Sequence, residues 1–297
     1  MHSLLTITDF IRWGASRFNE AGLYFGHGTE NALDEAAALV LHSLHLPPDL
    51  PVSWFDSRLT EEEREKVIAL MRRRIDERIP LPYLTGESWF AGLRFAVNQH
   101  VLIPRSPIAE LLESGFEPWV ESAEVRRVLD LCCGSGCIGI AAAVYLPETQ
   151  VDLVDISDQA LAVAGENIQE HNLEYRARLI KSDLFDSLKE GEYDVIVTNP
   201  PYVGRSELLQ LPEEYSYEPV LALEAEGEGL SIVAKILREA ERYLTPRGVL
   251  VVEVGNSAEA LMRRYPDIPF LWIDFERGGE GVFLFTAEEL KNYRDMF

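Results

Sequence analysis

The stretch Asp194-Val-Ile-Val-Thr-Asn-Pro-Pro-Tyr202 decides the fold that we expect for this chain. Its apolar β-branched run, residues 195–197, is typical of a strand buried on both faces of a parallel sheet. Two prolines, which cannot donate to a strand ladder, then end the strand. We therefore expect the Asn199 side chain and the Pro200 carbonyl at the carboxyl end of a central strand, where open α/β sheets bind ligands.

Two acceptors at this strand end suit a planar NH2 group. The amide oxygen of Asn199 and the carbonyl of Pro200 can each accept one of its hydrogens, and the ring of Tyr202 can stack on the planar group. The nitrogen then keeps one face open, which serves methyl transfer to an amide or an exocyclic amine, a poor nucleophile that needs positioning more than a base. A strand that merely ends on prolines is the alternative, and the cofactor signals upstream argue against it.

The first of these signals is a strand, loop and helix over residues 127–145. A short apolar strand (128–131) leads into the small-residue turn Cys132-Cys-Gly-Ser-Gly-Cys137 and then into a helix. Such a unit lets a ligand approach the backbone closely at a helix N-terminus. A second strand, residues 151–154, ends at Asp155, where a carboxylate is placed to accept from both hydroxyls of a ribose.

Three further residues indicate which nucleoside cofactor binds. Asp130, just before the turn, would repel a pyrophosphate but attract the amino group of an amino-acid moiety, which favours S-adenosylmethionine over a nicotinamide cofactor. After a third strand (177–180), Asp183 is placed to accept from an adenine amino group and Leu184 to pack on the ring. Asp183 could equally cap a helix.

The remaining pattern divides the chain into three parts. Residues 1–86 predict a small helical domain for substrate recognition, with helices over 7–18, 32–44 and from a capping box at Thr60 to about Arg78. Residues 87–107 predict a β-hairpin linker with its turn at Ala91-Gly92. In residues 108–297 strands and helices alternate, which predicts a parallel sheet, finished by an antiparallel pair from 270–275 and 282–285.

Composition narrows the choice of partner and compartment. The 297 residues include 27 basic and 50 acidic ones, a net charge of −23. This charge repels nucleic acid and favours a basic protein partner, although solubility in a crowded cytosol would also explain it. The N-terminus, Met1-His-Ser-Leu4, lacks a basic region followed by an apolar core, so we expect a cytoplasmic protein with no membrane association.

The cysteines predict neither a disulfide framework nor a metal site. Cys132, Cys133 and Cys137 lie within six residues of one another, and their number is odd. No fourth ligand stands near them in the sequence. We expect reduced thiols packed in the turn and the first helical turn after it.

Taken in order, these motifs resemble those of the protein-glutamine N5-methyltransferases over essentially the whole chain. The matching pieces are V-L-I-P-R (101–105), V-L-D-L-C-C-G-S-G-C (128–137), V-D-I-S (154–157), S-D-L-F (182–185), N-P-P-Y (199–202) and E-V-G (253–255). The resemblance implies a Rossmann-like class I methyltransferase domain with a mostly parallel seven-stranded sheet that ends in an antiparallel hairpin. It also implies S-adenosylmethionine as cofactor and S-adenosylhomocysteine as product.

The resemblance also implies residue roles. The cofactor-binding residues would be Asp130, Cys132, Gly134, Gly136, Asp155, Asp183, Leu184, Asn199 and Arg105. The substrate-binding residues would be Asn199, Pro200, Pro201, Tyr202 and Glu253. Of these, Asn199, Pro200 and Tyr202 would be catalytic.

Two branches of the family differ in ways that this sequence can show. The branch that acts on peptide-chain release factors usually reads P-R-P-[DE]-T-E and D-L-G-T-G-S-G. This chain reads Pro104-Arg-Ser-Pro-Ile-Ala-Glu110 and has Cys132 where that branch has glycine. Both departures, with W-F-D-S-R-L at 54–59, resemble the branch that methylates a glutamine of the third large-subunit ribosomal protein. That substrate is basic, which agrees with an acidic enzyme. Cys133 stands where a threonine is expected, a small change in the cofactor turn.

The expected reaction is attack by the glutamine amide nitrogen on the sulfonium methyl, in line and without a metal. The proton leaves after the attack, and no base is evident in the sequence. Alternatives are a release-factor methyltransferase, an adenine-N6 nucleic-acid methyltransferase and a non-catalytic ribosome-assembly factor. The charge of −23 argues against direct DNA binding. The acceptor could be the isolated ribosomal protein or an assembly intermediate.

Overall fold

The computed structural model describes residues 4–297, which form two compact units. The first unit contains residues up to Ser88 together with Pro212–Tyr217, and the second contains Trp89–Leu211 and Glu218–Phe297. The chain therefore passes from the second unit to the first and back again within the segment that follows Tyr202.

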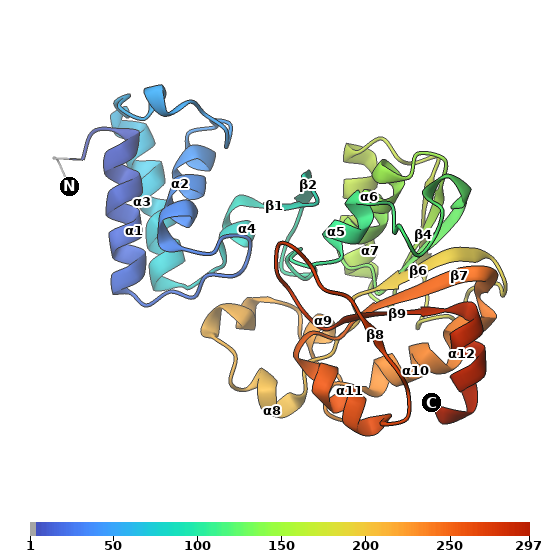
Figure 1. Ribbon diagram of the computed structural model, residues 1–297. Helices are drawn as coiled ribbons and strands as arrows, with labels where there is room; N and C mark the ends of the chain where they lie inside the picture. Colours follow the sequence, from blue (N-terminus) through green and yellow to red (C-terminus); the bar gives the residue numbers. More distant parts are fainter. Residues whose placement is uncertain (1–3) are drawn as a thin grey trace. The chain divides into compact units, whose positions relative to one another are not determined.

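The first unit is a helical bundle, as the sequence predicts (Figure 1). Capping boxes begin two of its helices, with Thr6 before α1 and Thr60 before α3. The helices pack around a core that includes the fully buried side chains of Phe10, Leu39 and Met71. Their bounds are α1 Ile7–Glu20, α2 Ala32–Ser43, α3 Glu61–Asp76 and α4 Leu81–Thr85.

A buried ionic network fastens the 212–217 segment to these helices. The Arg74 side chain is buried, and its Nε donates to Glu35 Oε1 at 2.5 Å. Its Nη1 and the Nη1 of Arg78 both reach Glu214 Oε1, at 3.3 and 3.0 Å. Burial raises the pKa of Glu214, but the Tyr24 backbone N–H and the Arg74 guanidinium outweigh burial and hold that pKa below its ordinary value. Glu214 is therefore an anchoring charge inside the first unit.

The second unit is built on a seven-stranded sheet with the order β5-β4-β3-β6-β7-β9-β8. The pairs among β5, β4, β3, β6 and β7 are parallel, and β9 is antiparallel to both β7 and β8. This is the mostly parallel sheet with a closing hairpin that the sequence predicts. The strands are β3 Arg127–Leu131, β4 Gln150–Asp155, β5 Ala177–Lys181, β6 Tyr193–Thr198, β7 Leu244–Glu253, β8 Leu271–Trp272 and β9 Val282–Thr286.

Helices cover both faces of this sheet (Figure 1). Side chains alternate across the sheet, so that Val195 and Val197 join the core under one helical layer and Ile196 joins the core under the other. The prediction that this strand is buried on both faces is therefore confirmed. One layer holds α5 Ala109–Glu113, α6 Cys137–Tyr145 and α7 Asp158–Glu170, and the other holds α10 Ser231–Glu239, α11 Ala258–Arg264 and α12 Ala287–Tyr293.

The strand order reverses between β3 and β6. After β3 the chain adds β4 and β5 on one side, and then returns to place β6 on the other side of β3. Leu131 pairs with Thr198 at the carboxyl ends of these strands, and the Thr198 hydroxyl donates to the Leu131 carbonyl at 2.6 Å. The turn that begins at Cys132 and the side chain of Asn199 therefore leave the sheet as neighbours, at the switch point where doubly wound sheets bind ligands.

Several local features differ from the sequence prediction or add to it. The expected hairpin is present as β1 Glu87–Phe90 and β2 Leu93–Ala96. The strand expected over 270–275 is only the two-residue β8, and the segment after Tyr202 contains α8 Arg205–Leu208 and α9 Val220–Leu223. Helix α12 was not expected from the sequence, although a capping box at Thr286 begins it. Within residues 4–297 no helix is long and apolar enough to cross a membrane.

Candidate active site

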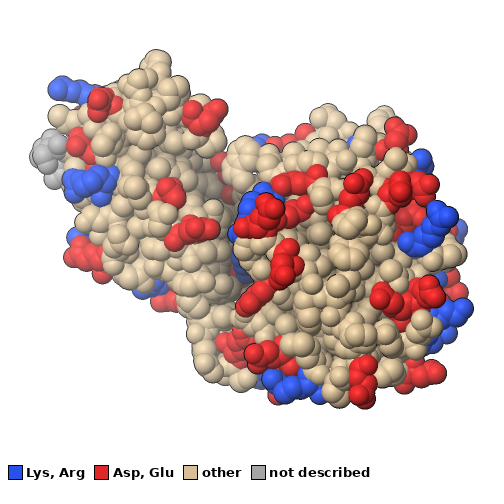
Figure 2. Space-filling view, viewed as in Figure 1, with Lys and Arg blue, Asp and Glu red and all other residues tan. Residues whose placement is uncertain are grey.

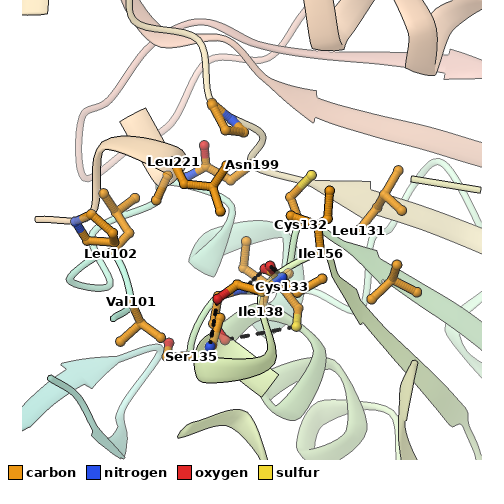
Figure 3. A pocket seen from close by; sticks show the side chains of 18 of the residues that line it. Val101, Leu102, Leu131, Cys132, Cys133, Ser135, Ile138, Ile156, Asn199 and Leu221 are labelled. Atoms are coloured by element: carbon orange, nitrogen blue, oxygen red, sulfur yellow. Dashed lines mark hydrogen bonds between the residues drawn. The ribbon is translucent and has the colours of Figure 1, made fainter. Parts of the chain in front are cut away.

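A cavity of about 290 Å³ opens at the switch point of the second unit (Figure 3). Eight of the predicted site residues line it: Arg105, Cys132, Gly134, Asp155, Asp183, Leu184, Asn199 and Pro201. The other five predicted residues lie outside its lining: Asp130, Gly136, Pro200, Tyr202 and Glu253. The wall is mostly apolar, and several of its polar groups, among them Asp155, Asp183 and Asn199, come from the ends of strands and the turns after them.

The turn after β3 brings the backbone to the edge of this cavity. Cys132, Gly134 and Gly136 all have positive φ, at 63°, 54° and 77°. A Cβ added at Gly136 would lie 2.8 Å from the Leu153 side chain, so packing against β4 requires glycine there. A Cβ at Gly134 would meet no atom within 4 Å, which leaves that part of the turn open to a ligand.

Asp155 is held in one orientation at the end of β4. Its Oδ2 accepts from the Gly134 backbone N–H and its Oδ1 from the Ser157 backbone N–H, both at 2.9 Å. Burial raises the pKa of this carboxyl, and the same backbone donors oppose the rise. A fixed carboxylate on the cavity wall, with lone pairs remaining on both oxygens, fits the vicinal hydroxyls of a ribose.

Asp130 lies beneath the turn. It is buried, and its Oδ2 accepts from the Gly139 backbone N–H of α6 at 2.8 Å. Among the described residues, no group donates to its Oδ1. Burial raises the pKa of Asp130 to about 7, and the nearby charge of Asp155 adds to the rise. A buried acceptor without a partner is costly, and it fits a cationic amino group brought by a ligand.

The apolar wall includes residues that the sequence analysis missed. Ile156 follows Asp155 directly and is 48% exposed, and Leu221 of α9 is 58% exposed, yet both line the cavity (Figure 3). Leu184 joins them from the turn after β5, with a positive φ of 48°. These side chains offer flat apolar surface to a ring. An apolar residue directly after a strand-end acid was the available signal for Ile156.

Asn199 reaches the cavity from the end of β6 and lines the same cavity as Leu221 (Figure 3). Behind it, Glu253 is buried at the end of β7. The Tyr202 hydroxyl donates to Glu253 Oε1 at 3.2 Å, and its ring packs on the backbone of Gly255, where an added Cβ would lie 2.8 Å away. In this structure Tyr202 thus supports Glu253, and its stacking on a planar substrate group stays a prediction.

Two more residues near the cavity, Ser106 and Glu218, were not predicted from the sequence. The Ser106 hydroxyl donates to Glu253 Oε2, and Glu218 holds the guanidinium of Arg105. Both residues are buried polar groups. Glu218 belongs to an acidic segment in which nothing in the sequence sets it apart from its neighbours.

The cysteine thiols are protonated structural groups. Burial raises the pKa of Cys137 to about 12 and raises those of Cys132 and Cys133 as well. All three cysteines are free thiols, of which Cys133 and Cys137 are buried, and a neutral thiol is a weak nucleophile and metal ligand. In residues 4–297 no group of three or more His, Cys, Asp or Glu side chains is arranged to hold a metal ion.

Comparisons with known proteins agree with this geometry. The family model described as methyltransferase small domain matches residues 111–228, and that described as PrmC N-terminal domain matches residues 9–86. Three similar relatives are each named ribosomal protein uL3 glutamine methyltransferase. The relative from Xanthomonas campestris pv. campestris is 55% identical over 97% of this chain and 93% of its own length. The relative from Francisella tularensis subsp. tularensis is 49% identical over 100% of this chain and 95% of its own length. The relative from Xylella fastidiosa strain 9a5c is 52% identical over 98% of this chain and 93% of its own length.

Solved structures resemble the chain more distantly. The hMettl16 catalytic domain in complex with an RNA hairpin has a TM-score of 0.49 at 18% identity, over 76% of this chain and 81% of that chain, a likeness too distant to bear on function. The relatives of known name decide the assignment, because they match nearly the whole chain. The chain therefore belongs to the family of ribosomal protein uL3 glutamine methyltransferases, enzymes whose methyl donor is S-adenosylmethionine.

Proposed function

We propose that this protein transfers a methyl group from S-adenosylmethionine to the side-chain amide nitrogen of a glutamine in ribosomal protein uL3. One observation carries the proposal: relatives with that name are 49–55% identical to this chain over nearly its whole length. Identity over 97–100% of the chain includes most of the helical unit as well as the catalytic unit. The proposal therefore covers the substrate as well as the reaction.

The residues around the cavity fit the cofactor in two parts. Asp155 would accept from the ribose hydroxyls, while Leu184 and Ile156 would pack on the adenine and Asp183 would accept from its amino group. When bound, the cofactor supplies a methyl group on a positively charged sulfur that is a strong leaving group.

The amino-acid part of the cofactor would lie at the glycine turn. Gly134 leaves open space there, and the unpartnered Oδ1 of Asp130 would accept from the amino group. Cys132 and Arg105 border the same space, with the Arg105 guanidinium already engaged by Glu218. Gly136 contributes through packing, since it lets α6 begin against β4.

The glutamine side chain would be held at the end of β6. The amide oxygen of Asn199 and the carbonyl of Pro200 would each accept one hydrogen of its NH2 group, which fixes the plane of the amide. Pro201 lines the cavity beside them and limits the freedom of the turn. This would place the amide nitrogen for attack on the methyl group, and its proton would leave to solvent after the attack, so the residues here would act by positioning.

The charge of the protein supports a basic substrate. The net charge is −23, and acidic side chains are spread over the visible face among fewer basic ones (Figure 2). Such a surface attracts a basic ribosomal protein and repels nucleic acid, so we propose no direct DNA binding. The three named relatives come from bacteria, in which ribosomal proteins are made and assembled in the cytoplasm, and we propose the same compartment for this enzyme.

The test offers the protein methyl-labelled S-adenosylmethionine and four acceptors. These are unmodified uL3, a large-subunit precursor that contains unmodified uL3, unmodified release factor and DNA. We expect label in uL3, located by mass spectrometry on the side chain of a glutamine. Comparing free uL3 with the precursor decides whether an assembly intermediate is the acceptor. Label in the release factor alone would overturn uL3 as the substrate, and label in DNA alone would overturn glutamine as the acceptor.

A further inference from the structure

Glu253 and Asn199 lie side by side at the carboxyl edge of the sheet. Strands β6 and β7 are parallel, and their last paired residues are Thr198 and Val252. The residues that follow are Asn199, just beyond the end of β6, and Glu253, the last residue of β7. Asn199 lines the cavity, whereas Glu253 is buried and lies outside the lining. The carboxylate therefore stands behind the amide that we assign to substrate binding.

The structure provides this buried carboxylate with its own donors. Ser106 Oγ donates to Oε2 and Tyr202 Oη donates to Oε1, the latter at 3.2 Å. Burial raises the pKa of Glu253, and Ser106, Tyr202, the charge of Arg105 and the amide of Asn199 all act in the opposite direction. A buried carboxylate is retained only where such donors surround it. Its donors come from two stretches of the chain that are distant from it in sequence, residues 105–106 and 199–202, so this arrangement is specific to the folded state.

The orientation of the Asn199 amide decides whether it can bind substrate. An asparagine side chain has an NH2 end that only donates and an oxygen that only accepts. The glutamine NH2 group needs an acceptor, so the Asn199 oxygen has to face the cavity. An ionised carboxylate only accepts, and therefore selects the NH2 end of its neighbour.

We propose that Glu253 is a positioning residue whose carboxylate holds the NH2 group of Asn199 and so presents the Asn199 oxygen to the glutamine amide. Ser106 and Tyr202 hold Glu253 in turn. This role rests on the proposed function, since it assigns the orientation of a substrate-binding group. It also gives Tyr202 a function in this structure that does not require its ring to face the cavity.

An exchange of the amide at position 199 and the carboxylate at position 253 tests the direct contact between these two side chains. Asn199→Asp places a second carboxylate against Glu253, and we expect turnover to fall by about 100-fold because the pair repels and moves. When Glu253→Gln is added, the amide at position 253 can donate to the carboxylate at position 199, so the pair again has one donor and one acceptor. Turnover of this double variant should be at least about tenfold higher than that of Asn199→Asp. A double variant no better than Asn199→Asp would overturn the proposal.

Single variants separate positioning from proton removal and from folding. Glu253→Gln keeps the size of the side chain and an acceptor oxygen, so it should retain more turnover than Glu253→Ala. The dissociation constant for S-adenosylmethionine should stay within about twofold of the wild type in both, because Glu253 lies outside the cavity lining. Equal inactivity of the two variants would assign Glu253 to proton removal and overturn positioning, and so would a parallel loss of cofactor binding.

A spectroscopic test decides the contact without any turnover. In the nitrogen–proton correlation spectrum of the isotope-labelled protein, the side-chain NH2 signal of Asn199 is the one that disappears in Asn199→Asp. One of its protons should lie downfield in the wild type and move upfield in Glu253→Ala, while the exposed Glu226→Ala leaves it in place. An Asn199 signal that ignores Glu253→Ala would overturn the proposal. If the wild type fails to methylate uL3, the proposed function fails, and this spectrum still decides the contact.

Discussion

Both terminal nitrogens of the Arg105 guanidinium donate hydrogen bonds to the buried carboxylate of Glu218. Nη1 donates to Oε1 at 2.6 Å and Nη2 donates to Oε2 at 2.8 Å. The backbone N–H of Ile103 adds a third bond to the same carboxylate, at 3.0 Å. Bidentate charged pairs of this kind fix geometry as well as contributing energy. The pair joins the Val-Leu-Ile-Pro-Arg stretch to the segment that carries Leu221, so it shapes two walls of the cavity at once.

Glu218→Ala should lower the free energy of unfolding by about 2–4 kcal/mol, because it removes the bidentate partner of Arg105 and the acceptor of Ile103. The change is measured by urea unfolding. The exposed Glu226→Ala, from the same acidic stretch, should change stability by less than about 0.5 kcal/mol. Equal stabilities of the two variants would contradict a structural role for the Arg105–Glu218 pair.

Asn199→Ala should reduce turnover by at least about 100-fold and leave cofactor affinity within about threefold of the wild type. The reason is that alanine removes the acceptor assigned to the glutamine NH2 group but leaves the glycine turn and Asp155 in place. Methyl transfer to uL3 and calorimetric binding of S-adenosylhomocysteine measure the two quantities. Asn256→Ala, an exposed position just beyond β7, serves as the control. Wild-type turnover in Asn199→Ala would remove the assigned role.

Asp155→Asn should weaken S-adenosylhomocysteine binding by about tenfold or more, because a charged acceptor for two hydroxyls becomes a neutral group with one acceptor. Binding is followed by calorimetry. Asp158→Asn is the matched control, since Asp158 begins the next helix and its carboxylate is exposed and paired with Lys181. Similar losses in the two variants would mean that general negative charge, and not the fixed carboxylate, supports binding.

Asp130→Asn should change how stability depends on pH. The pKa of Asp130 rises from 3.8 to about 7 on burial, so between these values the folded state holds a proton that the unfolded state has lost. The contribution of Asp130 to stability is therefore fully present below about pH 4 and is lost as the pH rises to about 7. Asparagine cannot ionise, so the free energy of unfolding of the variant, relative to that of the wild type, should increase steadily across this pH range.

Urea unfolding of the cofactor-free protein at several pH values between about 4 and 8 measures the Asp130 effect. The exposed Asp158→Asn should follow the wild-type pH dependence. A constant difference in stability between Asp130→Asn and the wild type would contradict a raised pKa at Asp130.

The sequence by itself determined the architecture and eight of the residues that line the cavity. Apolar runs such as 195–197 identify buried strands from local pattern alone, and the carboxyl ends of parallel strands meet at one edge of a sheet. That rule is enough to bring together the residues at or just beyond those ends, including Asp155, Leu184 and Asn199. All three line the cavity.

Only the tertiary structure decided which partners these residues have. Arg105 and Glu218 are 113 residues apart, and Ser106 and Glu253 are 147 apart, yet each pair meets across the fold. Tyr202 packs on Gly255, and Asp130 lies beneath the turn instead of on the cavity wall. The chain has 50 acidic residues, and the local sequence does not distinguish a buried glutamate from an exposed one. Burial and pairing depend on which distant segments come together in the folded protein. The local sequence pattern does not predict these long-range contacts.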